Sequence, residues 1–202
     1  MSMKSTKEKS FSDDLETWLK SPGSKTLSGM NAVFAEKSFA ITFLLLMSIP
    51  ALPIPTGGIT HIFEIITMLL ALELVVGLRT IWLPKRWKGI KLGRTMQLKA
   101  LPFILKRVRW FEKFSRPRLS HLLANTVTVS LLGLMVFGLT LTAFLAPPFS
   151  GLDTLPALGV VFIALGMILE DIYGALLGLL IGGVGVVVVV GLGSAIVKLV
   201  FN

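Results

Sequence analysis

A histidine and a glutamate inside an apolar segment have the clearest capacity for chemistry in this sequence. His61 and Glu64 lie within a largely apolar run at residues 59–78. Side chains three positions apart share one face of a helix, so these two can meet. A charged group at the centre of a membrane costs about 2.5–3.5 kcal/mol on insertion scales, which makes ionisable groups there functional candidates by default. The pair could exchange a proton, or it could be a structural hydrogen bond that joins two helices.

Two breaks in the apolar segments supply further candidates. The apolar run before the first break, residues 38–49, is too short to span a bilayer alone. Prolines interrupt the helix at both breaks, residues 50–58 and 147–156. The predicted ion- or substrate-binding residues there are Thr56, Gly57, Gly58 and Asp153. If the breaks faced each other, they would form a polar cavity like the binding sites of transporters. The alternative interpretation is two turns between spans, with Asp153 as a helix cap.

Four charged residues near segment ends are secondary candidates. They are Glu73, Arg79, Glu170 and Asp171. Glu73 lies nine positions after Glu64, about 180° around a helix, so the two glutamates cannot share a face. We expect Glu73 to pair with Arg79, and the acidic residues to face the membrane interface.

Other kinds of chemistry find no support in the sequence. It has no cysteine and only two histidines, which excludes thiol chemistry and disfavours a zinc enzyme. Phosphate-binding, hydrolase and metalloprotease motifs are absent from it. We therefore predict no catalytic residues, no metal site and no cofactor.

The composition indicates a membrane protein. Hydrophobic residues make up 53% of the 202 positions, and charged residues make up only 15%, against about 25% in a soluble domain. We predict an all-α, multi-pass transmembrane protein with five regions. These are an amphipathic interfacial segment at 1–36, a broken-helix pair at 37–78, a basic loop with an amphipathic helix at 79–120, a second broken-helix pair at 121–171 and a C-terminal transmembrane helix at 172–202.

The order of parts in residues 12–78 returns in residues 95–174, which predicts an internal duplication. An offset of 97 positions aligns Glu73 with Glu170 and Thr56 with Asp153. Whether the first pair re-enters the membrane or spans it stays open at this point.

Positive charge is concentrated in one loop. Residues 79–118 hold 13 Lys and Arg against the single acid Glu112. Such loops stay on the cytoplasmic side, so we predict that residues 79–118 and the N-terminal segment lie in the cytoplasm. The basic helix at residues 95–114, flawed by Pro102, should lie on anionic lipid headgroups. No groove-reading motif accompanies the charge, so nucleic acid is not an expected partner.

Three stretches resemble the ExoD family of bacterial membrane proteins linked to exopolysaccharide synthesis. They are LSGMNAVFAEKSFAITFLLLMSIPALPIPTGGI, ALELVVGLRTIWLP and TLPALGVVFIALGMILEDIYGALLGLLIGG. Their order fits residues 24–199. The resemblance implies an inner-membrane role in exopolysaccharide production and supplies no catalytic residues. His61 and Glu64 stand where the family pattern implies a more apolar helix.

Three functional hypotheses follow. The first is a small transport or translocation protein with its polar site at the two breaks. The second is a non-transporting scaffold that recruits polysaccharide-synthesis machinery through its basic face. The third is a lipid-handling protein with a headgroup site beside Glu73, Glu170 or Asp171. Self-association into a homo-oligomer is compatible with all three.

Overall fold

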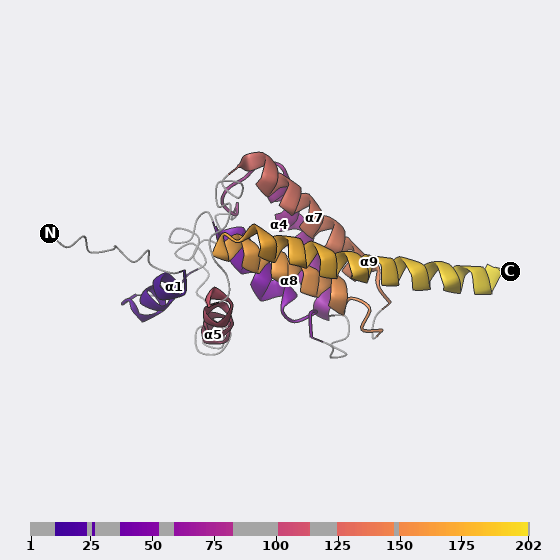
Figure 1. Ribbon diagram of the computed structural model, residues 1–202, viewed down its shortest axis with the longest axis horizontal. Coiled ribbons are helices and arrows are strands. Elements are labelled where there is room, and N and C mark those ends of the chain that lie inside the picture. Colours follow the sequence, from indigo (N-terminus) through magenta and orange to yellow (C-terminus); the bar gives the residue numbers. More distant parts are fainter. Residues whose placement is uncertain are drawn as a thin grey trace.

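The computed structural model shows an all-helical protein, as the sequence predicts (Figure 1). It describes residues 11–23, 26, 37–52, 59–82, 101–113, 125–147 and 150–201. These residues form seven helices and no β-strand. The helices are α1 (Phe11–Lys20), α3 (Ser38–Met47), α4 (Ile59–Val75), α5 (Leu101–Glu112), α7 (Thr126–Leu145), α8 (Thr154–Leu169) and α9 (Ile172–Phe201).

Helix α3 is short and lies inside the helix packing. Seven of its ten residues are buried, and it contacts α8 and α4. At 1.5 Å per residue it is about 15 Å long, about half the hydrocarbon thickness of a bilayer. Because α3 is covered by other helices and too short to cross, it is a core element of the bundle.

Helices α4 and α7 run antiparallel in close contact. The ring of His61, near the start of α4, lies beside Phe144 near the end of α7. At the other end, Gly133 of α7 faces Leu74 of α4, and a Cβ on this glycine would lie 3.1 Å from the backbone nitrogen of Val75. The two backbones therefore touch at Gly133, which fixes the register of the pair.

Helices α8 and α9 form the most extensive helix pair, and glycine makes it close. A Cβ on Gly178 would lie 2.6 Å from the carbonyl oxygen of Gly159, and one on Gly166 would lie 2.4 Å from the backbone nitrogen of Ala175. Between the helices, Glu170 adopts the left-handed conformation, with φ of 55°. Small residues of this kind let membrane helices approach backbone to backbone.

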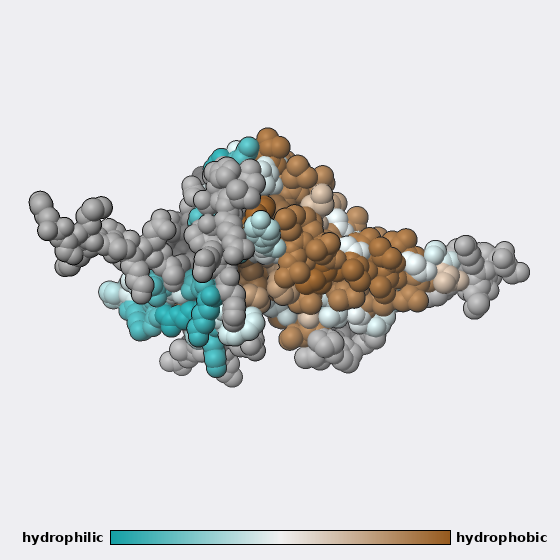
Figure 2. All heavy atoms as spheres, viewed as in Figure 1, coloured by the Kyte–Doolittle hydropathy of each residue, from teal (hydrophilic) through white to brown (hydrophobic). Residues whose placement is uncertain are grey.

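Large apolar side chains cover the outer surfaces of α4, α7 and α9. Exposed fractions reach 59% at Leu69, 67% at Leu145 and 72% at Val187. Figure 2 shows that the face it presents is largely apolar over the body of the molecule. Two described segments, Thr126–Leu145 and Ile172–Ala195, are long and apolar enough to cross a membrane. Such a continuous apolar exterior suits contact with lipid rather than water.

A polar unit formed by α1 and α5 stands at one end of the bundle (Figures 1 and 2). Leu15 and Val108, one from each helix, have no exposed surface. The backbone N–H and hydroxyl of Ser12 both donate to the carboxylate of Glu112. Pro102 lies in the first turn of α5, where proline disrupts no helical hydrogen bond. Pro102 is therefore no flaw in α5 as the structure describes it.

Replacing Gly178 by alanine should destabilise the protein, because the added Cβ would lie 2.6 Å from backbone atoms of α8. Overpacking of this kind costs about 1–3 kcal/mol, so thermal unfolding in detergent should occur at lower temperature. Gly183→Ala is the matched control on the same helix, because a Cβ there meets no described atom within 4 Å. Equal melting temperatures for the two variants would contradict the close α8–α9 contact.

Candidate functional site

His61 and Glu64 form a hydrogen-bonded pair in the first half of α4. Nδ1 of His61 and Oε2 of Glu64 are 2.7 Å apart. The side chain of Glu64 has no exposed surface, whereas that of His61 is 29% exposed. Phe144 of α7 holds the imidazole from the other side, with ring centroids 5.2 Å apart in an edge-on arrangement. The imidazole thus stands between the surface and a fully buried carboxyl group.

One buried stripe of α4 positions this pair. Its residues recur every three or four positions, which places them on a single helix face. They are Thr60, Glu64, Thr67, Ala71 and Leu74, and each is at most 2% exposed. The opposite face carries exposed isoleucines and leucines. The stripe is polar in its first half and apolar in its second, so one helix face changes character along its length.

Helix α7 brings a further polar side chain to this stripe. Thr140 has no exposed surface. Thr140 lies seven positions after Gly133 and four before Phe144, so the three residues share a helix face. Both Gly133 and Phe144 contact α4. The antiparallel register therefore places Thr140 level with Glu64.

Three buried polar atoms in this region have no hydrogen-bond partner among the described residues. They are Oε1 of Glu64, Oγ1 of Thr67 and Oγ1 of Thr140. An unsatisfied buried polar group costs about 1–3 kcal/mol, so three of them mark a place where packing is not optimised for stability alone. We call His61, Glu64, Thr67 and Thr140 the polar trail.

The polar trail ends against an apolar contact. Beyond Thr67 the stripe of α4 continues with Ala71 and Leu74, both buried. Gly133 of α7 packs against these two residues backbone to backbone. At this contact the two backbones close the space between the helices, whereas His61 at the other end of the trail is 29% exposed.

Asp153 lies near the His61 end of the polar trail. It stands at the N-cap position of α8, but its side chain makes no capping hydrogen bond. Its charge interacts electrostatically with both Glu64 and His61. The structure therefore brings together residues from the two halves of the chain. The predicted residues Thr56, Gly57 and Gly58 lie outside the described residues.

The secondary candidates lie elsewhere. Glu73 accepts a hydrogen bond from the backbone N–H of Trp82 at 3.0 Å, and Arg79 donates to the hydroxyl of Thr126 at 2.8 Å. Both lie at the α4 end opposite His61, so neither belongs to the polar trail.

Glu170 and Asp171 lie at the turn between α8 and α9. Glu170 pairs with Lys37 at 2.8 Å. Oδ1 of Asp171 accepts a hydrogen bond from the backbone N–H of Tyr173 at 3.1 Å, which caps α9. Within the part of the chain that the structure describes, no three His, Asp or Glu side chains cluster as a metal-ligand set.

Sequence reasoning identified the His61–Glu64 pair by its spacing but did not identify Thr140. A threonine in an apolar helix carries no local signal, because its hydroxyl commonly bonds to its own helix. Only the register between α4 and α7 shows that Thr140 faces Glu64.

These features define a class of protein: an all-helical, membrane-associated bundle with a buried carboxyl–imidazole pair. Residues 11–191 match the family described as "Exopolysaccharide synthesis, ExoD", so the chain belongs to the ExoD family, and the resemblance seen in the sequence is confirmed. The chain is also 29% identical over 179 residues to an uncharacterized protein from Synechocystis sp.. That match covers 87% of this chain and 78% of the relative. No solved structure matches the chain.

Replacing Thr140 by valine should raise the melting temperature in detergent. Valine keeps the branched shape and removes a buried hydroxyl without a described partner, which relieves about 1–3 kcal/mol. Thr142→Val is the matched control, because the Thr142 hydroxyl donates to the carbonyl of Gly138 at 2.9 Å. If Thr140→Val melted below Thr142→Val, the hydroxyl of Thr140 would have a stabilising partner and the site as described would be wrong.

Proposed function

We propose that this chain is a multi-pass protein of the bacterial inner membrane whose α1–α5 end faces the cytoplasm. The support is the contrast between a polar end and an apolar body (Figure 2), together with 13 basic residues in residues 79–118. Positively charged loops remain on the cytoplasmic side. The N-terminal segment shares this side because α1 packs on α5, and the His61 end then faces outward.

In this membrane the protein acts as a small transport or translocation protein that supports exopolysaccharide synthesis. The observation that carries this proposal is the fully buried Glu64, hydrogen-bonded to a partly exposed His61. A glutamine could make a structural hydrogen bond here without the cost of burying an ionisable acid. A carboxyl group at this place is therefore best explained by a need to change its protonation state.

The geometry suggests how a proton would move. The imidazole of His61 takes it up from the outer side, since it is the most accessible member of the polar trail. Transfer to Glu64 follows the 2.7 Å hydrogen bond, and Asp153 adds negative charge near the entrance. The hydroxyls of Thr67 and Thr140 extend the path inward until Ala71 and Leu74 close it. Exchange with the cytoplasm then requires the α4–α7 contact to open.

The helix pairing supports an internal duplication. Helix α4 packs on α7, and α3 packs on α8. If α3 corresponds to α7 and α4 corresponds to α8, then the α4–α7 contact in one half corresponds to the α8–α3 contact in the other. A two-fold relation between the halves therefore accounts for both contacts. Repeats of this kind place binding sites between the halves of transporters, where His61, Glu64 and Asp153 lie.

A scaffold role is the second candidate, and the exposed basic face of α5 favours it. Lys106, Arg109 and Lys113 are exposed on this helix. They would recruit polysaccharide-synthesis machinery from the cytoplasmic side. Neither candidate assigns catalytic residues or a cofactor to the chain.

Glu64→Gln should lower proton flux by about tenfold or more, because an amide cannot take up and release a proton at this point. The measurement uses the purified protein in liposomes that enclose a pH-sensitive dye, with an imposed pH gradient. Glu73→Gln is the matched control: it makes the same change on the same helix, at the end opposite His61.

Equal flux for the two variants would remove Glu64 from the mechanism. Absence of flux from the unaltered protein, for protons and for small cations, would overturn the transport proposal. Loss of exopolysaccharide after Lys106→Gln and Arg109→Gln, with Glu64→Gln tolerated in cells, would instead support the scaffold.

A further inference from the structure

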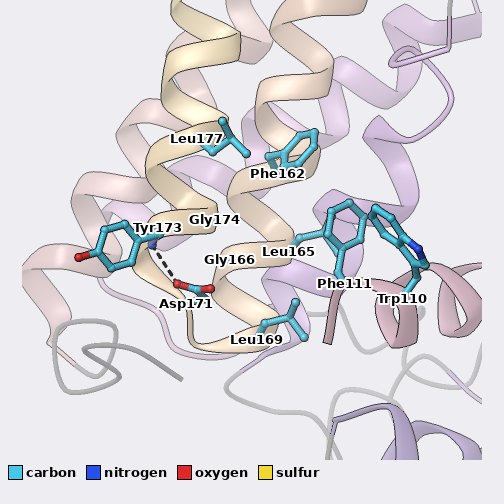
Figure 3. A pocket seen from close by; sticks show the side chains of 10 residues that line it. All are labelled: Trp110, Phe111, Phe162, Leu165, Gly166, Leu169, Asp171, Tyr173, Gly174 and Leu177. Atoms are coloured by element: carbon cyan, nitrogen blue, oxygen red, sulfur yellow. Dashed lines mark hydrogen bonds between the residues drawn. The ribbon is translucent and has the colours of Figure 1, made fainter. Parts of the chain in front are cut away.

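An apolar groove and a basic pocket meet at Trp110, at the α5 end of the bundle. The apolar groove lies between α5, α8 and the start of α9 and has a volume of about 310 Å³. The basic pocket follows the exposed face of α5 and has a volume of about 430 Å³. Both volumes are in the range of sites for small molecules. Trp110 lines both, so they are two parts of one surface feature. Figure 3 shows Trp110 with the other residues that line the apolar groove.

Aromatic contacts fix the wall of the apolar groove. The rings of Trp110 and Phe111 meet edge to face with centroids 4.9 Å apart. Phe111 meets Phe162 of α8 in the same manner at 5.7 Å. These contacts hold α5 against α8, and Trp110 remains 54% exposed at the junction. The indole thus has an apolar side on the groove and an accessible edge toward the basic pocket.

The apolar groove is continuous with the lipid-facing surface of α9. Leu177 lines the groove and is itself exposed. Leu180 and Val184 follow it on the same helix face and are also exposed. The carboxylate of Asp171 lies on the side of the groove away from Trp110 (Figure 3). A long apolar chain could therefore leave the groove along α9 without meeting a charge.

Positive charge surrounds the other side of Trp110. Lys106, Arg109 and Lys113 line the basic pocket. Arg109 pairs with Glu16. The hydrogen bond from Lys20, followed by that from Arg109, holds the pKa of the Glu16 carboxyl below its usual value. Among the described residues, Lys106 and Lys113 form no ion pair. Two lysines therefore remain to meet an anion.

We propose that this feature binds one anionic phospholipid. The acyl chain lies in the apolar groove and continues along α9. The phosphate is held by Lys106 and Lys113 in the basic pocket, and Trp110 packs between the two at headgroup level, where tryptophan is favoured. A free anion would need only the basic pocket, and an apolar peptide would need only the groove. A lipid with a phosphate headgroup is the ligand that uses both.

This lipid site is independent of the proposed transport function. It lies at the α1–α5 end, whereas the polar trail opens at the other end of α4. Failure of one proposal would leave the other unchanged.

Fluorescence of Trp110 tests the site in the full chain. Replacing Trp18, Trp82 and Trp87 by phenylalanine leaves Trp110 as the single tryptophan, whose emission is excited selectively over that of Tyr173. The protein is reconstituted in phosphatidylcholine vesicles that contain brominated phosphatidylglycerol or, at equal mole fraction, brominated phosphatidylcholine. Bromine quenches only nearby indoles. We expect brominated phosphatidylglycerol to associate beside Trp110 several-fold more strongly than brominated phosphatidylcholine.

Matched substitutions separate the two parts of the lipid site. Lys106→Gln and Lys113→Gln should each lower this preference about fivefold, the effect of one basic residue near a membrane surface. Lys20→Gln, which removes a lysine outside the basic pocket, should leave the preference unchanged. Leu177→Phe should weaken quenching by narrowing the apolar groove. Val190→Phe, farther along α9, outside the groove and on another helix face than Leu177, should not.

Each outcome decides the proposal. A preference that falls with both lysine variants and with Leu177→Phe supports a lipid that spans groove and pocket. Equal quenching by the two brominated lipids would overturn the phosphate site. Displacement of brominated phosphatidylglycerol by water-soluble glycerol phosphate would show that a free anion is the ligand, and would overturn the commitment to a lipid.

Discussion

A carboxyl group enclosed in an apolar bundle is the constraint on which this structure depends. Glu64 has no exposed surface, and its only described hydrogen-bond partner is His61. The surrounding helices must supply polar groups where the acid lies and exclude them elsewhere. The buried stripe of α4 does both, with Thr67 beside the acid and Leu74 farther along. One helix face therefore holds the site in its first half and seals the bundle in its second.

The two ends of the molecule carry different sets of charged groups. Acidic groups and one imidazole gather where α4 begins, with Asp153 contributed from the other half of the chain. Lysines and arginine gather around α5 at the opposite end, beside an apolar groove. Helices α8 and α9 pass between these ends as one closely packed hairpin. The apolar body separates the two sets of charges, so each end can interact with ligands independently of the other.

Local sequence patterns predicted the helices well because apolar runs and prolines mark their extent. The His61–Glu64 contact followed from a spacing of three residues, which needs no knowledge of tertiary structure. Thr140 could not be found in this way, since its relation to Glu64 depends on the register of helices far apart in the chain. The role of Asp153 stayed open for the same reason.

Helix α5 shows a second limit of sequence reasoning. Its amphipathic pattern predicted a helix lying on the membrane surface, and the structure adds that Phe111 on this helix packs on Phe162 of α8. Hydrophobic periodicity shows that one helix face needs an apolar partner, but it does not distinguish lipid from protein. The apolar groove arises from this long-range contact and was therefore invisible in the sequence.

The backbone contact at Gly133 has a mechanical consequence. At this point α4 and α7 touch directly, and toward His61 they are separated by side chains. Helices joined in this way rotate most easily about the point of contact. His61 lies 13 residues from Leu74, a lever arm of about 20 Å. A tilt of a few degrees at Gly133 therefore displaces the imidazole by more than an ångström, whereas the contact of Gly133 with Ala71 and Leu74 barely moves.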